Sequence, residues 1–239
     1  MSGTRPGSGP NGVDAVFYKQ VVDSLRNKSA LMMFLMFPLV ALIFKNAMAE
    51  TQLASALPMF MTMHVLIVPI IYTSSVVAEE KEAGTLRMLT MSGVGPLSYL
   101  CGVAGTIGVA SILSSLLFLP CIDGLNAGMV ERFLMTNAAC VACSLLIGLA
   151  IALVAKRQVN AAPISAPVSM ALGMLPMLSS LNDRLEAFAR WTYTQPAYEQ
   201  FSDLASTTMT SREAMVVAVN AMALVVLFLV LFRMRRLTD

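Results

Sequence analysis

The sequence predicts an all-α membrane protein with six transmembrane helices. Of its residues, 57% are hydrophobic and only 13% are charged, and the mean hydropathy is +0.73, so the chain is more apolar than soluble domains. Six apolar runs, bounded by charged or polar residues, each reach the roughly 20 residues that a helix needs to cross the hydrocarbon layer. We therefore expect spans at residues 30–49, 53–78, 97–122, 133–155, 159–181 and 214–232.

The part before the first span divides into a polar tail and an amphipathic helix. Residues 1–12 are rich in Gly, Pro and Ser and lack the apolar core of a signal peptide, so we expect a flexible tail. Residues 13–28 are expected to be helical, with an apolar arc opposite a polar arc. The apolar arc comprises Phe17, Tyr18, Val21, Val22 and Leu25, and the polar arc comprises Lys19, Gln20, Asp23, Ser24, Arg26 and Asn27. Two placements fit: in the cytoplasmic membrane interface, or packed on the inner ends of the bundle.

The basic residues predict the orientation of the chain. With the N-terminus inside, eleven of the sixteen Lys and Arg residues fall on the cytoplasmic side: Arg5, Lys19, Arg26, Lys28, Lys81, Arg87, Lys156, Arg157, Arg233, Arg235 and Arg236. The remaining basic residues are Lys45, Arg132, Arg184, Arg190 and Arg212. Because cytoplasmic loops carry the excess of Lys and Arg, we expect a multi-pass protein of the cytoplasmic membrane with both termini inside.

Two features inside the spans raise the question of metal or catalytic chemistry. Cys140 and Cys143 form C-x-x-C within an apolar run, but no second pair or nearby His accompanies them, so a zinc site lacks ligands and we interpret both as packing residues. The one histidine, His64, lies mid-span, where an ionisable group is costly and is a functional candidate. It either faces a watery cavity or is a neutral imidazole bonded to a neighbouring helix.

Motifs of intramembrane enzymes and of nucleotide hydrolases are missing from the sequence. The spans hold no H-E-x-x-H, no G-x-S-x-G and no paired carboxylates, and G-x-x-x-x-G-K-[ST] does not occur. We therefore expect a chain that is not itself catalytic and binds no cofactor or metal of its own.

One charged segment, AEEKEAGTLRMLTMSGVGP, separates the second and third spans. It begins with the residues Glu79, Glu80, Lys81 and Glu82. We expect a short cytoplasmic helix over about residues 79–95, because acidic residues suit a helix N-terminus and Leu86 and Leu89 share one face. Such a helix can dock into a groove on a soluble partner. Lying flat among lipid headgroups fits less well, because membrane-surface helices are usually rich in Lys and Arg.

This segment resembles the Glu-Arg-Glu-x-Gly-Thr signature of ABC-2 type transporter permeases, the membrane subunits of ATP-driven exporters. The match is Glu80-Lys81-Glu82-Ala83-Gly84-Thr85-Leu86, in which Lys81 replaces the common Arg and loses its bidentate fork. The resemblance covers almost the whole chain and implies that residues 29–239 form the family's transmembrane domain. It also implies a coupling helix, inserted into a separate ATP-binding subunit that holds ATP and Mg²⁺. The residues carrying this role would be Glu79, Glu80, Lys81, Glu82, Gly84, Thr85, Leu86 and Leu89.

Residues 182–210, between the fifth and sixth spans, resemble the short external re-entrant segment of that family. The segment is too polar to span, yet apolar residues recur at helical spacing, namely Leu185, Phe188 and Trp191. Asn182 or Asp183 could cap this helix, and Pro196-Ala197-Tyr198 looks like the family's Pro-x-x-Tyr turn. At the outer interface we expect Trp191, Tyr193 and Tyr198. They form either a plain aromatic belt or part of the outlet.

The resemblance also implies a transport function. Many of the 19 methionines lie in the first two spans and would give an adaptable lining for varied amphipathic cargo, or else fill the core and face lipid. Our candidates for the substrate pathway are Phe60, Met61, Met63 and His64. We predict an export permease for a drug or small antimicrobial peptide, paired with two ATP-binding subunits and a second identical or homologous permease. Lipid or polysaccharide export, and a non-transporting scaffold or immunity protein, are the alternatives.

Overall fold

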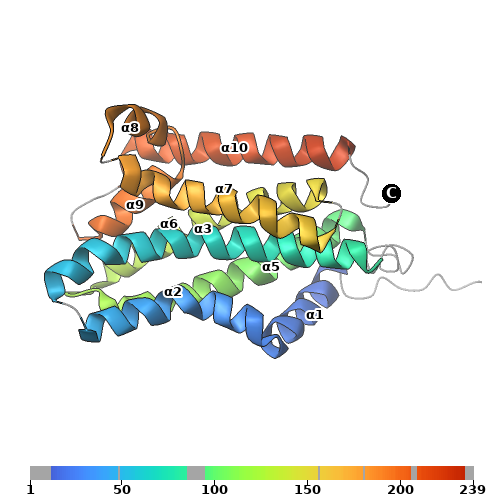
Figure 1. Cartoon of the computed structure of the whole chain (residues 1–239), viewed down its shortest axis with the longest axis horizontal. Coiled ribbons are helices and arrows are strands. Elements are labelled where there is room, and N and C mark those ends of the chain that lie inside the picture. The colour runs from blue at the N-terminus through green and yellow to red at the C-terminus, as the bar shows by residue number, and fades with distance from the viewer. Residues whose placement is uncertain are drawn as a thin grey trace, which may run out of the picture.

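The computed structural model describes residues 12–234 except 48, 85–94, 156, 180 and 206–208. Every regular element in this part of the chain is helical, and six helices are long and apolar enough to cross a membrane. The predicted all-α fold with six spans is therefore confirmed. The spans run along the long axis of the molecule (Figure 1), so the bundle has two ends. We call them the α1 end, which also holds the end of α10, and the α8–α9 end.

The helices follow one another in the order α1 (Gly12–Arg26), α2 (Lys28–Ala47), α3 (Glu50–Glu82), α5 (Pro96–Ser115), the short 3₁₀ helix η1 (Leu116–Cys121), α6 (Ala127–Val154), α7 (Gln158–Ser179), α8 (Asp183–Ala189), α9 (Thr194–Ser202) and α10 (Ser211–Met234). Among the starts of the spans, the largest difference from the prediction is at α6, which begins at Ala127 rather than at residue 133. An apolar run marks only the part of a helix that lies in hydrocarbon. α6 begins before that part, directly after Asn126. The side chain of Asn126 caps the helix by accepting the N–H of Met129 at 2.9 Å.

α3 is the central helix of the bundle and contacts α2, α5, α6, α7 and α9. It approaches α6 closely at Gly148. A Cβ atom on this residue would lie 2.9 Å from the carbonyl oxygen of Ile70 and 2.9 Å from Cβ of Thr73, so only glycine lets the two backbones meet. α10 lies at the edge of the bundle, mainly against α6, and few of its side chains are buried.

α1 packs across the end of α5, with contacts to α2. The residues of α1 that face the bundle are Val16, Gln20 and Ser24, all buried, whereas Tyr18 and Leu25 of the predicted apolar arc are exposed. Two predicted polar residues are therefore part of the packing face, and the Ser24 hydroxyl bonds the buried hydroxyl of Tyr72 at 3.1 Å. One face of α1 therefore packs on the bundle, as one of the two predicted placements has it, and the placement of Tyr18 and Leu25 in the membrane interface stays a prediction.

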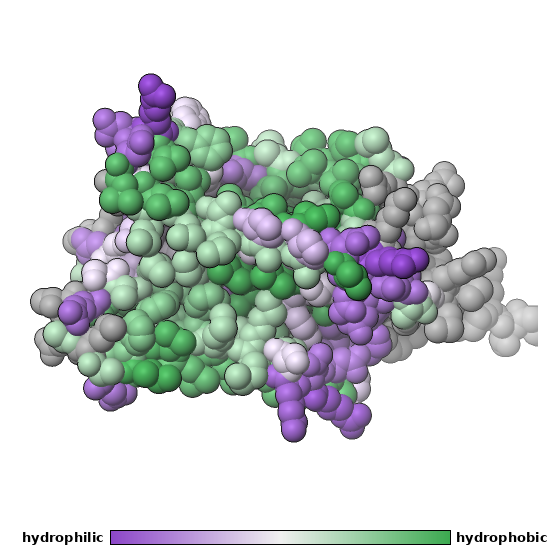
Figure 2. Space-filling view, viewed as in Figure 1, coloured by the Kyte–Doolittle hydropathy of each residue, from purple (hydrophilic) through white to green (hydrophobic). Residues whose placement is uncertain are grey.

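The hydropathy of the surface differs between the middle of the bundle and its two ends. Figure 2 shows a broad hydrophobic belt over the middle of the bundle, with hydrophilic residues gathered toward its two ends. An exposed apolar surface of this extent marks contact with lipid rather than with water.

Candidate functional site

The charged segment begins inside α3 rather than in a new helix. Glu79, Glu80, Lys81 and Glu82 form the last turn of α3, so the expectation that they open a separate helix is wrong. The chain turns at Gly84, whose φ of 69° is a left-handed conformation that favours glycine. Thr85, Leu86 and Leu89 lie outside the described residues, and the next helix that the structure describes, α5, begins at Pro96.

Acidic residues at a helix C-terminus are unfavourable unless another group compensates them. Here the compensation comes from α7, which begins directly beside the end of α3. Oε2 of Glu82 accepts the backbone N–H of Gln158 at 3.0 Å, and Oε2 of Glu79 accepts the side-chain amide of Gln158 at 3.2 Å. The carboxylate of Glu82 therefore caps the positive N-terminal end of α7, and that of Glu79 holds the side chain of Gln158 beside it.

Two basic residues complete the connections of the last turn of α3. Nζ of Lys19, on α1, lies 2.7 Å from Oε1 of Glu80, whose side chain is only 13% exposed. Nζ of Lys81 donates to the carbonyl oxygen of Ala155, at the end of α6, at 3.2 Å. The last turn of α3 is thus tied to α1, α6 and α7 at once.

A cavity of about 260 Å³ lies between α1 and the end of α3. Its lining includes Lys19, Asp23, Tyr72 and Glu80, so both partners of the α1–α3 ion pair border open space. The ion pair is therefore not enclosed by packed side chains on every side.

The candidate pathway residues lie in the middle of α3. His64 is fully buried, and its Nε2 lies 3.0 Å from Oγ of Ser114 and 3.1 Å from the carbonyl oxygen of Ser111. The ring sits edge-on to Phe37 and Phe118. His64 is therefore bonded to the neighbouring helix α5, which is one of the two predicted arrangements.

The other three pathway candidates differ in exposure. Met61 is 1% exposed and belongs to an apolar cluster with Phe118 and Phe133, whereas Phe60 and Met63 are half-buried. In this structure Met61 and His64 are packing residues within one chain, and only Phe60 and Met63 retain accessible surface.

The segment between α7 and α10 folds into α8 and α9 at the opposite end of the bundle (Figure 1). Asn182 caps α8 by accepting the N–H of Arg184 at 2.9 Å, as one of the two predicted caps. Trp191 is 68% exposed and Tyr198 is half-buried, whereas Pro196 is buried. Exposure of Trp191 agrees with a place at a membrane interface.

Tyr193 was expected beside Trp191 at the interface, and this expectation is wrong. Its side chain is only 2% exposed, and its hydroxyl bonds Oγ of Ser144, in the middle of α6, at 3.1 Å. The neighbouring thiols of α6, Cys140 and Cys143, are free and buried in the same region, which agrees with their interpretation as packing residues. The hydroxyl of Tyr193 can be buried because Ser144 satisfies it.

Sequence reasoning singled out the acidic residues but missed their partners. Lys19 and Gln158 lie 61 and 76 residues away in the sequence from the carboxylates that they bond. Lys19 looked like an ordinary member of a polar helix arc, and Gln158 like the start of an apolar run. No local signal marks either residue.

Similarity to a known protein family extends over most of the chain. A family model described as ABC-2 family transporter protein matches residues 44–234. This range holds five of the six spans completely, with the end of α2 and both candidate regions described above. Among curated proteins, none matches the sequence at a significant level.

Proposed function

Because the chain belongs to the ABC-2 family of transporter proteins, the membrane component of ATP-binding cassette transporters, we propose that it is the permease of an exporter for hydrophobic or amphipathic cargo. A drug or a small antimicrobial peptide has this character. Membership implies association with an ATP-binding subunit. In our proposal two such subunits hold ATP and Mg²⁺, and a second permease, identical or homologous, completes the pathway.

The observation that best supports this proposal is the bracing of the last turn of α3. Directly before the segment that would dock on the ATP-binding subunit, Glu80 contacts α1 through Lys19, and Glu82 contacts the start of α7 through Gln158. A force applied beyond Gly84 would therefore act on three helices together. In this mechanism the segment after Gly84, which would dock on the ATP-binding subunit, acts as a handle. Residues 79–84 are the base of this handle.

α3 can carry such a force across the membrane. It is a continuous helix from Glu50 to Glu82, and it contacts α2, α5, α6 and α7 as well as α9 at the far end. Packed helices of this kind transmit rigid-body shifts. A tilt of α3, driven by closure of the ATP-binding subunits, would move α9 and open the pathway on the outer side.

The contacts at the base of the handle suit repeated movement. Gln158 is exposed, and in the Lys19–Glu80 pair the side chain of Lys19 is 42% exposed and that of Glu80 13%, so water can reach these contacts when they break. Transmission nevertheless requires that these contacts differ between the two states of the cycle. We propose that the Lys19–Glu80 pair is made in one state and altered in the other.

The character of the cargo rests on the bundle and on the short external segment. Phe60 and Met63 remain candidates for cargo contact, and Met61 and His64 would contribute only after α3 has moved. α8 and α9 are short, which favours a small amphipathic cargo over a long polysaccharide that needs a large outer receptor. Lipid export remains an outcome of the experiment below.

The test is coupled ATP hydrolysis and transport in proteoliposomes that hold the permease and its cognate ATP-binding subunit. We expect the permease to change the ATPase rate and an amphipathic dye to accumulate with ATP. Glu82→Lys should abolish both effects, because it places a cation at the positive end of α7. Gly84→Pro should do the same, because proline cannot adopt the positive φ of this turn.

The matched control is Glu131→Lys, the same charge change at an exposed position of α6 toward the α8–α9 end, which should leave coupling intact. A scaffold or immunity protein would leave the ATPase rate unchanged and would not respond to any of the variants. Transport of a labelled lipid with no transport of dye would replace the cargo assignment and keep the permease assignment.

A further inference from the structure

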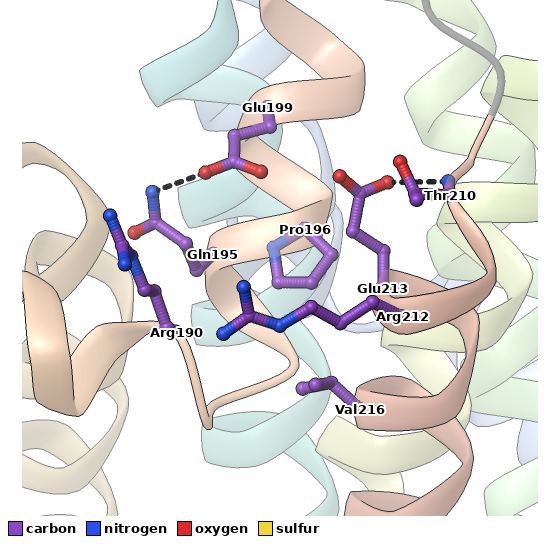
Figure 3. A pocket seen from close by; sticks show the side chains of 8 residues that line it. All are labelled: Arg190, Gln195, Pro196, Glu199, Thr210, Arg212, Glu213 and Val216. Carbon is purple, nitrogen blue, oxygen red and sulfur yellow. Dashed lines mark hydrogen bonds between the residues drawn. The ribbon is translucent and has the colours of Figure 1, made fainter.

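A polar cavity of about 330 Å³ opens at the α8–α9 end, between the start of α9 and the first turns of α10. Its polar lining, shown in Figure 3, comprises Arg190, Gln195, Glu199, Thr210, Arg212 and Glu213. Two cationic and two anionic side chains therefore face one small space. The cavity lies apart from the handle, and a ligand could bind there whether or not the chain transports cargo.

The charges around this cavity are not equally satisfied. Arg190 is paired with Glu186 on its own helix. The carboxylate of Glu199 accepts the amide of Gln195 at 2.7 Å, and that of Glu213 accepts the backbone N–H of Thr210 at 2.9 Å. Within the described part of the chain, the guanidinium of Arg212 has no ion pair and no hydrogen bond.

The cationic and acidic groups lie at different levels along α10. Figure 3 shows the guanidinium of Arg212 on the side of Val216, and the carboxylates of Glu199 and Glu213 on the side of Thr210. α10 enters its span in the direction from Thr210 to Val216. Arg212 is therefore nearer to the hydrocarbon, and the carboxylates are nearer to water.

The surroundings of the cavity are those of a membrane surface. Exposed apolar side chains continue along α10 directly below it, with Met215 57%, Val219 59% and Met222 69% exposed. Trp191, next to Arg190 in the chain, is 68% exposed, and tryptophan is enriched at the level of lipid headgroups. A molecule in the cavity can thus keep a polar head among the charges and an apolar tail against α10.

We propose that this cavity binds the headgroup of a phospholipid that carries both a phosphate and an ammonium group. The planar guanidinium of Arg212 binds the phosphate, which lies nearer to the hydrocarbon. Glu199 and Glu213 bind the ammonium group, and the acyl chains lie along the exposed face of α10. A purely anionic headgroup would leave two carboxylates facing negative charge, and a soluble ligand would gain nothing from α10.

The test is native mass spectrometry of the full chain in detergent, titrated with phosphatidylethanolamine or phosphatidylglycerol of identical acyl chains. We expect tighter binding of phosphatidylethanolamine. Arg212→Gln should weaken this binding about tenfold, as loss of a charge-assisted contact does. Glu199→Gln should reduce the preference over phosphatidylglycerol. Arg184→Gln, an exposed arginine of α8 outside the cavity lining, is the matched control and should bind like the original chain.

Three outcomes would overturn the proposal. One is equal binding of both lipids, and another is an Arg212→Gln variant that binds as the original chain does. The third is full competition by glycerophosphoethanolamine, which has the same headgroup without acyl chains, at concentrations similar to those of the lipid. Arg212 and Glu199 are exposed, so unchanged thermal melting of both variants separates loss of binding from loss of the fold.

Discussion

The two ends of the bundle hold their helices together by different means. At the α1 end, charged side chains connect elements that are distant in sequence, as in Lys19–Glu80 and Glu82–Gln158. At the α8–α9 end, the closer of two charged pairs is local, Glu186–Arg190, and the pair that joins distant elements, Lys45–Asp123, is wider at 3.9 Å. Two further long-range connections there are neutral: Tyr193 bonds Ser144, and the side chain of Asn220 bonds the carbonyl oxygen of Trp191 at 2.8 Å.

This difference bears on which end of the bundle keeps its geometry and which end can rearrange. A buried neutral hydrogen bond leaves an unsatisfied group when it breaks and therefore fixes a geometry. A partly exposed ion pair is replaced by water at little cost. We thus expect the α8–α9 end to move as one rigid unit, and the α1 end to be the part whose contacts rearrange during a cycle.

The largest expected effect lies between the two ends, where α3 meets α6 at Gly148. Gly148→Ala would bring a Cβ to 2.9 Å from the carbonyl oxygen of Ile70, and this backbone atom cannot move aside as a flexible side chain would. We expect a loss of about 1–3 kcal/mol of stability and loss of communication between the ends. Thermal unfolding in detergent and coupled ATPase activity measure the two effects.

Gly173→Ala in α7 is the matched control. A Cβ there would lie 3.7 Å from Cγ of Met63, an ordinary contact, so the helix-favouring alanine should be neutral or stabilising by up to about 1 kcal/mol. Equal destabilisation by both variants would contradict the close α3–α6 approach.

The next effect concerns the hydrogen bonds that hold the α8–α9 end together as one unit. Tyr193→Phe leaves the buried hydroxyl of Ser144 without its partner and should cost about 1–2 kcal/mol. The double variant Tyr193→Phe with Ser144→Ala should cost less than the sum of the single changes, because the two groups form one interaction. Chemical denaturation of all three variants tests this, and strict additivity would show that the bond does not contribute.

A smaller effect on stability is expected at the α1 end. Lys19→Met should cost about 1 kcal/mol, because the side chain of Lys19 is 42% exposed but its loss leaves the Glu80 carboxylate, only 13% exposed, without its cation, and the difference should shrink as salt rises. Coupled transport should fall more than stability does. The charge-reversed pair Lys19→Glu with Glu80→Lys should restore part of the coupling; a double variant no better than the worse single variant would count against the ion pair as a working contact.

The smallest effect concerns the charged pair that connects distant elements at the α8–α9 end. Lys45 and Asp123 approach to 3.9 Å, and the side chain of Asp123 is 83% exposed. Asp123→Asn should change stability by less than about 0.5 kcal/mol and leave coupling unaffected. A loss of coupling as large as that in Lys19→Met would remove the distinction between the two ends.

The spans could be predicted from the sequence because the bilayer imposes its thickness on composition. Each helix must place about 20 apolar residues in hydrocarbon. This requirement can be recognised in the sequence without knowing which helices pack against one another. The family motif likewise identified Glu80 and Glu82 as candidate functional residues. The sequence does not predict features that depend on contact with a residue far away in the chain.

The acidic residues show this failure most clearly. A dipole rule applied to residues 79–82 predicts the start of a helix, but Gln158 brings the N-terminus of α7 beside them, and so they end α3. Tyr193 was assigned to the interface by its type, and Ser144 makes its burial possible. Gln20, polar by type, is buried because α1 packs on the bundle.

The most direct test of the proposed mechanism is whether the segment after α3 touches the ATP-binding subunit. Thr85→Cys, in a chain whose exposed Cys101 is changed to Ser, should form a cross-link to that subunit, with a yield that differs between ATP and ADP. Glu131→Cys should form none. If Thr85→Cys instead reacts in intact cells with a maleimide that cannot cross the membrane, and forms no cross-link, the handle lies outside and the mechanism is wrong.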